Sequence, residues 1–191
     1  MVTIVQKENP VLRKIAKEIP LSEIKSAKIK KVIRDMKTML ATQEDGVAIA
    51  APQIGESVRM FVVAGKIFDE HFRKGEVAQA VPQKESSPDL VFINPVILKL
   101  SKTRKWMHEG CLSVRPLWGQ VYRSTNATIT AYDENGIKIT RGAGGLLAHI
   151  FQHETDHLDG VLFIDKAKDV APGEVPPQKE TPKTKKVKSE K

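Results

Sequence analysis

The sequence predicts an α+β fold, in which antiparallel β-sheets wrap a helix near the C-terminus and an N-terminal helix packs outside them. Two observations support this class. Apolar residues recur at helical spacing near each end of the chain, and short runs rich in β-branched residues lie between these two segments, separated by turn residues. The order of helix, strands and helix favours antiparallel sheets over repeated strand–helix–strand units.

The first helix is expected over residues 22–43, with Pro20 before it and Ser22 as its N-cap. One face of this helix should be buried, because its apolar side chains follow near helical spacing: Ile24, Ile29, Val32, Ile33, Met36, Met39 and Leu40. Its lysines then form the solvent-facing side.

Strands are expected at residues 58–64 and 90–100, and as a hairpin formed by residues 127–132 and 137–141. Asn135-Gly136 favours a type I′ turn in this hairpin, which requires positive φ at both central positions. Residues 65–89 are polar and weakly patterned, so a long surface loop is expected there. The last helix should begin near Gly144 or Gly145 and carry residues 146–158.

The length and composition of the chain fit one domain, which we place at residues 1–168. With 191 residues, 40% of them hydrophobic, the chain can bury a core without help from disulfides, and its only cysteine is Cys111. The N-terminal residues are charged too early for a signal peptide, and no apolar run approaches eighteen residues. We therefore expect a cytoplasmic protein with no membrane partner.

The last residues, 169–191, are expected to form a disordered basic tail. Residues 172–191 contain four prolines, six lysines, three glutamates and no aromatic residue, so they cannot bury enough apolar surface to order themselves. Their charge of +3 is a large share of the total of +8. The tail is either a solvated extension or a segment that docks onto an acidic surface such as ribosomal RNA, without reading a nucleic-acid sequence.

The predicted last helix carries the pattern His-Glu-x-x-His, with His153 and His157 four residues apart. This spacing places both imidazoles on one helix face, where they can bind one metal ion. Glu154 lies one residue further round the helix, beside the ion. It can therefore act as general base and acid, taking a proton from a metal-bound water that attacks the substrate.

A hydrolytic metal site needs a third protein ligand and an open position. In the extended zincin pattern the third histidine would fall on Phe163, and the downstream glutamates lie in the predicted tail. The remaining ligand should come from upstream, where Cys111 is the candidate. A thiolate with two imidazoles accepts iron, zinc, cobalt or nickel.

Two other interpretations remain open at this point. A zincin-type endopeptidase would use His153, Glu154 and His157 but leaves Cys111 without a role. A basic ribosome-associated or RNA-binding protein could instead hold a structural metal, which would require a closed site with a fourth ligand from His108 or His149.

Three segments, in this order and spacing, resemble the peptide deformylase family. They are residues 46–55 (GVAIAAPQIG), residues 109–113 (EGCLS) and residues 152–160 (QHETDHLDG), and the resemblance extends over residues 10–165. It implies removal of the formyl group from the N-formylmethionine of nascent polypeptides, with release of formate. The implied ion is Fe²⁺, or alternatively Zn²⁺, Ni²⁺ or Co²⁺, bound by Cys111, His153 and His157.

The resemblance also implies the remaining site residues. The side-chain amide of Gln53 and the backbone N–H of Leu112 would form the oxyanion hole. The substrate would lie extended between Val47 and Gly110, and its methionine side chain would enter a pocket that includes Val47, Leu146, His149 and Ile150. The chain departs from the family pattern at two positions, since the family usually has glycine at the position of Ala48, and arginine or an aliphatic residue is frequent at that of His149.

Overall fold

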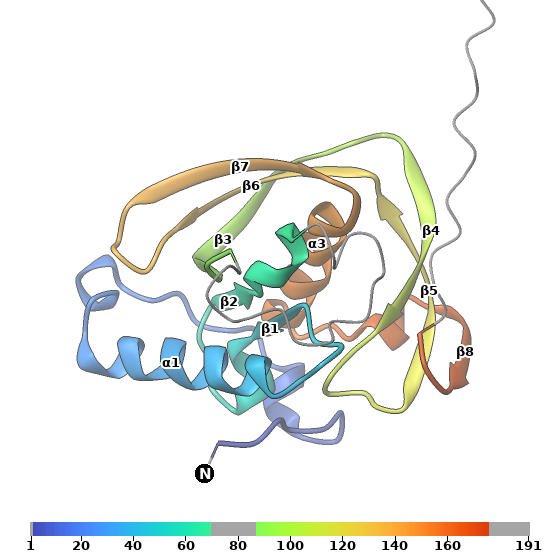
Figure 1. The fold of residues 1–191 in the computed structure, drawn as a ribbon, viewed down its shortest axis with the longest axis horizontal. Helices are drawn as coiled ribbons and strands as arrows, with labels where there is room; N and C mark the ends of the chain where they lie inside the picture. The colour runs from blue at the N-terminus through green and yellow to red at the C-terminus, as the bar shows by residue number, and fades with distance from the viewer. Residues whose placement is uncertain (1, 70–86, 176–191) are drawn as a thin grey trace, which may run out of the picture.

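The structure is a computed structural model that describes residues 2–69 and 87–175. The described strands form two antiparallel sheets, with the orders β1-β2-β3-β6-β7 and β4-β5-β8 (Figure 1). The first sheet consists of β1 (Ala48–Ala50), β2 (Met60–Val63), β3 (Leu90–Leu100), β6 (Asn126–Tyr132) and β7 (Lys138–Gly144). The second consists of β4 (Arg104–Gly110), β5 (Leu117–Ser124) and β8 (Lys168–Pro172).

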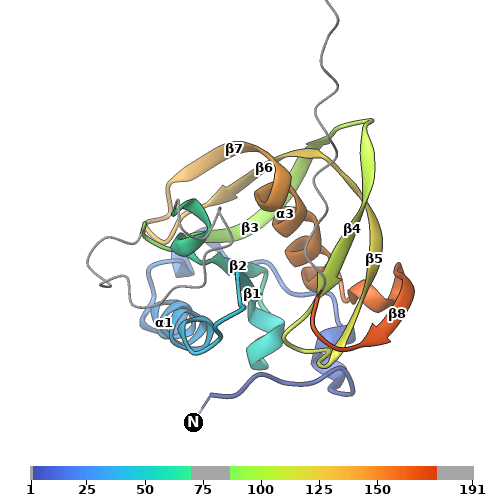
Figure 2. The same ribbon diagram turned by 45° about the vertical axis from the view of Figure 1, so that its right-hand side comes forward.

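Helix α3 (Gly145–Leu158) lies between the two sheets, as Figure 2 shows. It packs against β1, β2, β3, β6 and β7 of the larger sheet and against β5 of the smaller one. Phe151 of α3 contacts the stacked rings of Phe61 and Phe92 on the sheet, with the Phe92–Phe151 centroids 5.2 Å apart. The predicted arrangement of antiparallel sheets around a late helix is therefore confirmed.

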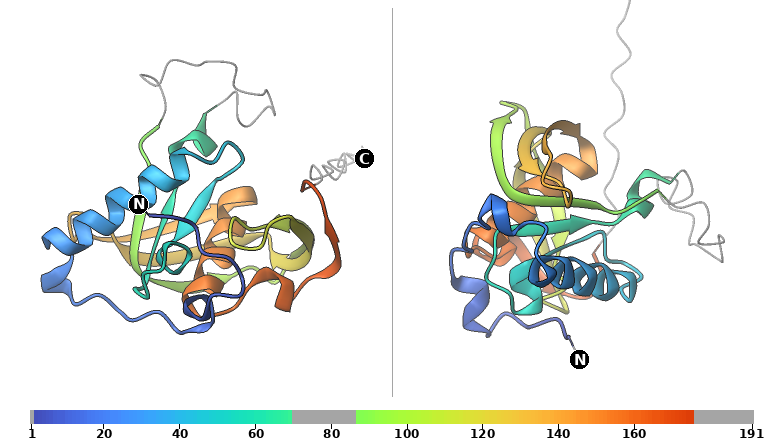
Figure 3. Two further views of the ribbon diagram at one scale, coloured as in Figure 1. Left: turned by 90° about the horizontal axis from the view of Figure 1, so that it is seen from below. Right: turned by 90° about the vertical axis from the view of Figure 1, so that its left-hand side faces the viewer.

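Helix α1 (Ala27–Ala41) packs outside β1 and β2, as expected of the N-terminal helix (Figure 3). It buries Ile29, Val32, Ile33, Met36 and Leu40. The predicted N-cap, however, was wrong. Ser22 lies in a short 3₁₀ turn (Leu21–Glu23), and Ser26 caps the helix by accepting a hydrogen bond from the backbone N–H of Ile29 at 3.2 Å. Both serines precede apolar residues at helical spacing, so periodicity alone does not distinguish them.

The predicted hairpin is formed by β6 and β7, but its turn is not type I′. Gly136 has a φ of +78°, whereas Asn135 is not among the described residues with positive φ. The carboxylate of Asp133 accepts hydrogen bonds from the backbone N–H groups of Asn135 and Ile137, and the Gly136 N–H donates to the Asp133 carbonyl. This side-chain bonding favours a turn with one left-handed residue.

The strands predicted at 58–64 and 90–100 are observed as β2 and β3, and the helix start predicted near Gly145 is observed. Of the expected loop at 65–89, the first residues form a 3₁₀ turn (Gly65–Phe68), while residues 70–86 lie outside the described part of the chain.

Strand β8 pairs with β5 and extends to Pro172, so the tail boundary expected at residue 169 falls inside a strand. The side chain of Lys168 lies over the ring of Trp106, which adds a cation–π contact between β8 and β4. Ordered structure therefore continues past the predicted boundary, and the expected tail at 176–191 lies outside the described residues. Within the described residues, no helix is both long and apolar enough to cross a membrane.

Candidate metal centre

Three candidate metal ligands converge from two parts of the fold. Cys111 directly follows β4, while His153 and His157 project from α3. One nitrogen of each histidine and the Cys111 sulfur all lie within 4.8 Å of one another, and the Sγ of Cys111 is 3.2 Å from Nε2 of His157. In a tetrahedral site with bonds of 2.0–2.3 Å, ligand atoms are about 3.3–3.8 Å apart. The donor set therefore fits a metal ion after small adjustments.

The two histidines have different electrostatic surroundings. Burial and the neighbouring His153 hold the pKa of His157 well below its ordinary value, so this imidazole is neutral and able to bind a metal. Burial would also lower the pKa of His153, but hydrogen bonds to Cys111 and Glu109 outweigh burial and raise it. A positive charge on the His153 ring is thus stabilised between Glu109 and Cys111.

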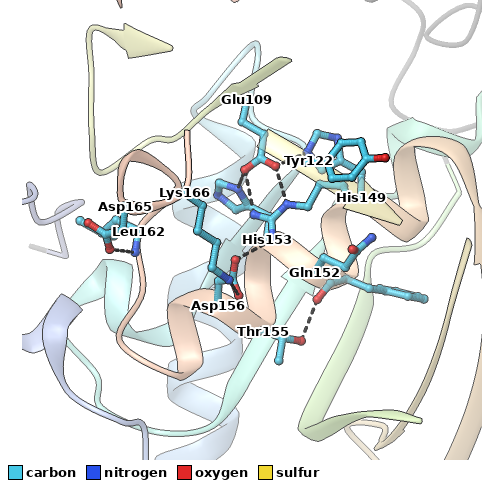
Figure 4. A network of polar contacts seen from close by, with 12 residues as sticks. Glu109, Tyr122, His149, Gln152, His153, Thr155, Asp156, Leu162, Asp165 and Lys166 are labelled. Carbon is cyan, nitrogen blue, oxygen red and sulfur yellow. Dashed lines mark hydrogen bonds and ion pairs between the residues drawn. The ribbon is translucent and has the colours of Figure 1, made fainter. Parts of the chain in front are cut away.

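Glu109, in β4, holds the other side of His153 (Figure 4). Its Oε2 accepts a hydrogen bond from Nδ1 of His153 at 2.8 Å, and its Oε1 accepts one from Nε2 of His149 at 2.7 Å. Arg123 of β5 donates to both oxygens, from Nε at 2.7 Å and from Nη2 at 3.1 Å. Because Nδ1 of His153 carries the proton in this arrangement, its Nε2 is the free donor atom for a metal.

The polar network continues from Arg123 to the protein surface. Nη1 of Arg123 donates to Asp156 at 2.6 Å, and Asp156 also accepts from Lys166 at 2.7 Å. Burial alone would raise the pKa of Glu109, but the bonds from His149, His153 and Arg123 outweigh burial and hold that pKa far below its usual range. Glu109 is therefore an ionised carboxylate inside the protein.

Glu154 is the second buried carboxylate near the three ligands, with only 3% of its surface exposed. Its Oε2 has no hydrogen-bond partner among the described residues. Burial raises its pKa to about 7; the charge of His153 lowers it and that of Glu109 raises it further. A carboxyl group with this pKa can both take up and release a proton near neutral pH.

Gln53 lies in the 3₁₀ turn (Ala51–Ile54) that follows β1, and its amide points at the candidate ligands. Its Oε1 accepts a hydrogen bond from the backbone N–H of Ala50 at 2.8 Å, which fixes the amide orientation. Its Nε2 then lies 3.4 Å from the sulfur of Cys111 and 3.3 Å from the hydroxyl of Ser113. Leu112 directly follows Cys111, and its carbonyl accepts a hydrogen bond from the side chain of Gln6.

The residues expected to bind substrate have several environments. Val47 precedes β1 and packs against the apolar cluster that contains the buried Ile150. Leu146 is more accessible, with 42% of its surface exposed. Gly110 ends β4, and a Cβ placed on it would come within 2.5 Å of a methyl group of Val175, so the segment after β8 passes beside this strand. His149 is bonded to Glu109 and is not part of the cluster formed by the three ligand atoms.

Ala48 lies in β1, where it pairs with Val63. It is not among the described residues with positive φ. The Cβ that it adds in place of the usual glycine therefore causes no backbone strain in this strand.

The sequence analysis assigned no role to Glu109, although Glu109 lies in a segment that it singled out, and none to Arg123. An acidic and a basic residue on neighbouring strands are a signal for an ion pair. That the pair is buried against α3 follows only from the packing of the two sheets around that helix.

The comparisons with known proteins agree on one family. Residues 1–172 match the family model described as polypeptide deformylase. Peptide deformylase 1A, chloroplastic/mitochondrial, of Arabidopsis thaliana is 38% identical over 164 residues, which are 85% of this chain but only 60% of that protein. The peptide deformylase of Leptospira biflexa is 37% identical over 161 residues, which are 84% of each chain.

A solved structure supports the same relationship. The class I type b peptide deformylase from Acinetobacter baumannii, with Met-Ala-Ser bound, superposes with a TM-score of 0.71 at 28% identity. The match covers 87% of this chain and 98% of that one.

Proposed function

Because the chain belongs to the peptide deformylase family, we propose that it is a metal-dependent hydrolase that removes the formyl group from the N-formylmethionine of newly synthesised polypeptides. The observation that carries this proposal is the convergence of Cys111, His153 and His157 beside the buried Glu154. Three protein ligands leave one position open, as hydrolytic metal sites require.

The geometry does not favour an endopeptidase of the zincin type. The position of the third zincin histidine is taken by Phe163, whose buried ring lies parallel to His153 with the centroids 6.5 Å apart. The cysteine ligand supplied from β4 takes the place of that histidine. The Cys111–His153–His157 set thus distinguishes the site from that of a zincin.

A structural metal site in an RNA-binding protein is not favoured either. Such a site would need a fourth ligand from His108 or His149. Within the described residues neither belongs to the metal-ligating cluster, and His149 is held by Glu109 instead.

The residues fit a divalent ion, and we propose Fe²⁺, with Zn²⁺, Ni²⁺ and Co²⁺ as alternatives. When bound, the ion supplies Lewis acidity and lowers the pKa of water in the open position. One thiolate and two neutral imidazoles leave a net charge of +1 on a divalent ion, less than three imidazoles would. The protein must therefore supply more of the stabilisation of the developing oxyanion.

Glu154 is proposed to move the proton. In its ionised form it takes a proton from the attacking water and later gives it to the leaving amine of the methionine. Its raised pKa, about 7, suits both steps. Gln53, held by the Ala50 N–H, and the backbone N–H of Leu112 are proposed to donate hydrogen bonds to the oxygen of the formyl group as it becomes negative.

The substrate is proposed to bind as an extended peptide between Val47 and Gly110, as an added strand. Its methionine side chain would be bordered by Val47, Leu146, His149 and Ile150. The Met-Ala-Ser peptide in the Acinetobacter baumannii structure supports a short peptide as ligand. We further propose a cytoplasmic location, a catalytic domain that runs from residue 1 to the end of β8 at Pro172, and an encounter with the ribosome through the basic residues after 175.

Release of formate from formyl-Met-Ala-Ser by the iron-loaded protein under anaerobic conditions tests the proposal. We expect turnover by the wild-type protein and none by the Cys111→Ala variant, which should also lose its metal. No turnover by a wild-type protein that holds one equivalent of metal would disprove the function, and undiminished metal in Cys111→Ala would remove Cys111 as a ligand.

A further inference from the structure

His149 is a second histidine on α3 that contacts the same carboxylate as the candidate ligand His153. The two residues are four apart, so they lie on one face of the helix. His149 is buried, with 9% of its surface exposed, and its Nε2 donates to Oε1 of Glu109 at 2.7 Å. Figure 4 shows the two rings on either side of the Glu109 carboxylate.

The two histidines reach this carboxylate with different ring nitrogens, and this difference separates their roles. His153 uses Nδ1, the nitrogen nearer its backbone, so its outer Nε2 remains available for Cys111 and a metal. His149 uses its outer nitrogen, Nε2, on Glu109 itself. Nε2 of His149 is thereby committed to the carboxylate, and His149 is not part of the cluster formed by the three candidate ligand atoms, so we do not treat it as a ligand.

Among the described residues, four hydrogen bonds fix Glu109, two on each of its oxygens. Oε1 accepts from Nε of Arg123 and Nε2 of His149, and Oε2 accepts from Nη2 of Arg123 and Nδ1 of His153. Arg123 binds both oxygens from β5, and its third nitrogen, Nη1, is itself held by Asp156 at 2.6 Å, so Arg123 fixes the carboxylate from the side of the smaller sheet. His149 supplies the anchor from the helix that also carries the ligands.

We propose that His149 is a positioning residue that acts through Glu109 to hold His153 in the orientation and tautomer that bind the metal. This inference rests on the metal centre of the proposed function. Without the His149 bond, Oε1 of a buried carboxylate loses one of its two partners, and Glu109 rotates to regain one. The bond from Oε2 to His153 then weakens, and with it the hold of His153 on the ion.

Metal retention in His149→Leu and His149→Gln tests the proposal. Leucine fills a similar volume without a donor, whereas the glutamine amide nitrogen can occupy the place of Nε2. We expect zinc-loaded His149→Leu to lose its metal to a chelator about three- to thirtyfold faster than wild type, and His149→Gln to stay within about threefold. In iron-loaded enzyme, His149→Leu should lower kcat, in addition to any change in KM that follows from its place beside the methionine pocket.

Several outcomes would overturn the inference. If His149→Leu keeps its metal as wild type does and only raises KM, His149 is a wall of the substrate pocket and nothing more. If the leucine variant does not fold, His149→Asn takes its place, because its amide nitrogen mimics Nδ1 instead of Nε2. Equal metal loss from the asparagine and glutamine variants would then contradict the proposal.

Metal retention and deformylation are measured separately, so the two proposals can fail separately. If wild-type protein retains zinc but releases no formate, only the proposed function is contradicted. If wild-type protein binds no divalent metal, both the proposed function and the positioning role of His149 are contradicted.

Discussion

Glu154 combines burial, an unpartnered carboxylate oxygen and a position next to His153 in sequence. A buried polar atom without a partner is costly, so it indicates a group that the fold keeps ready for a ligand or substrate. Among the described residues, Glu154 is not part of the cluster formed by the three candidate ligand atoms, which separates the proposed proton carrier from the metal-binding set.

We predict that Glu154→Gln keeps its metal and loses nearly all turnover. Glutamine preserves the shape of the side chain but takes no proton from water, so kcat should fall about a hundredfold or more. Metal content, measured by elemental analysis, and formate release give the two readouts, with wild-type protein loaded in parallel. Turnover near the wild-type level would show that another group moves the proton.

The residues that carry a local pattern could be predicted from the sequence, and those that depend on packing could not. His153, Glu154 and His157 share one helical turn, and Cys111 followed because the downstream positions for a third ligand were unsuitable. Gln53 came only from the family resemblance. The hydrogen bond between Glu109 and His149 was missed, because it joins β4 to α3 across forty positions of the chain.

At the scale of elements, helix α1 offers a direct comparison between two serines. Ser26 accepts a hydrogen bond from the Ile29 N–H, whereas Ser22 makes no side-chain cap and lies in the preceding 3₁₀ turn. An N-cap oxygen satisfies a backbone N–H at the start of the helix that otherwise has no partner.

We predict that Ser26→Ala lowers the free energy of unfolding by about 1 kcal/mol, since the cap is lost. Ser22→Ala, the matched control, should change it by less than about 0.5 kcal/mol. Urea unfolding followed by circular dichroism measures both values. Equal effects of the two substitutions would mean that the hydrogen bond of Ser26 does not stabilise the helix.

Strands with a clear apolar pattern could be predicted from the sequence more readily than strands rich in charged residues. Strand β3 is apolar over most of its length and was predicted with the observed bounds, whereas β4 and β8 are rich in charged residues and were not predicted as strands. These two strands flank β5 in a small sheet whose exposed side chains include Trp106 and Tyr122. Pairing with β5 decides their conformation, and no local pattern carries that information.

At the scale of the molecule, the candidate site joins the two sheets. Cys111 follows β4 of the smaller sheet, Gln53 follows β1 of the larger one, and α3 between them carries the two histidines. Three separate regions therefore meet at one point, and the relative position of the sheets sets the geometry of the site. The smaller sheet depends on β8, which closes its far edge near the end of the described chain.

Two truncations separate the part of the C-terminus that supports this sheet from the part that follows it. Removal of residues 176–191 should leave the melting temperature and the turnover of formyl-Met-Ala-Ser unchanged, because this lysine- and proline-rich segment has little apolar surface to bury. If this segment binds ribosomal RNA as proposed, its removal should weaken salt-sensitive binding to ribosomes, because several lysines are lost.

Removal of residues 168–191 should also lower the melting temperature by several degrees, since β5 loses the pairing of Leu117 and Trp118 with β8 and Trp106 loses Lys168. Differential scanning calorimetry, the formate assay and ribosome co-sedimentation at two salt concentrations distinguish these effects. If removal of residues 176–191 leaves ribosome binding unchanged, the basic segment is only a solvated extension. If removal of residues 168–191 leaves the melting temperature unchanged, β8 does not stabilise the fold.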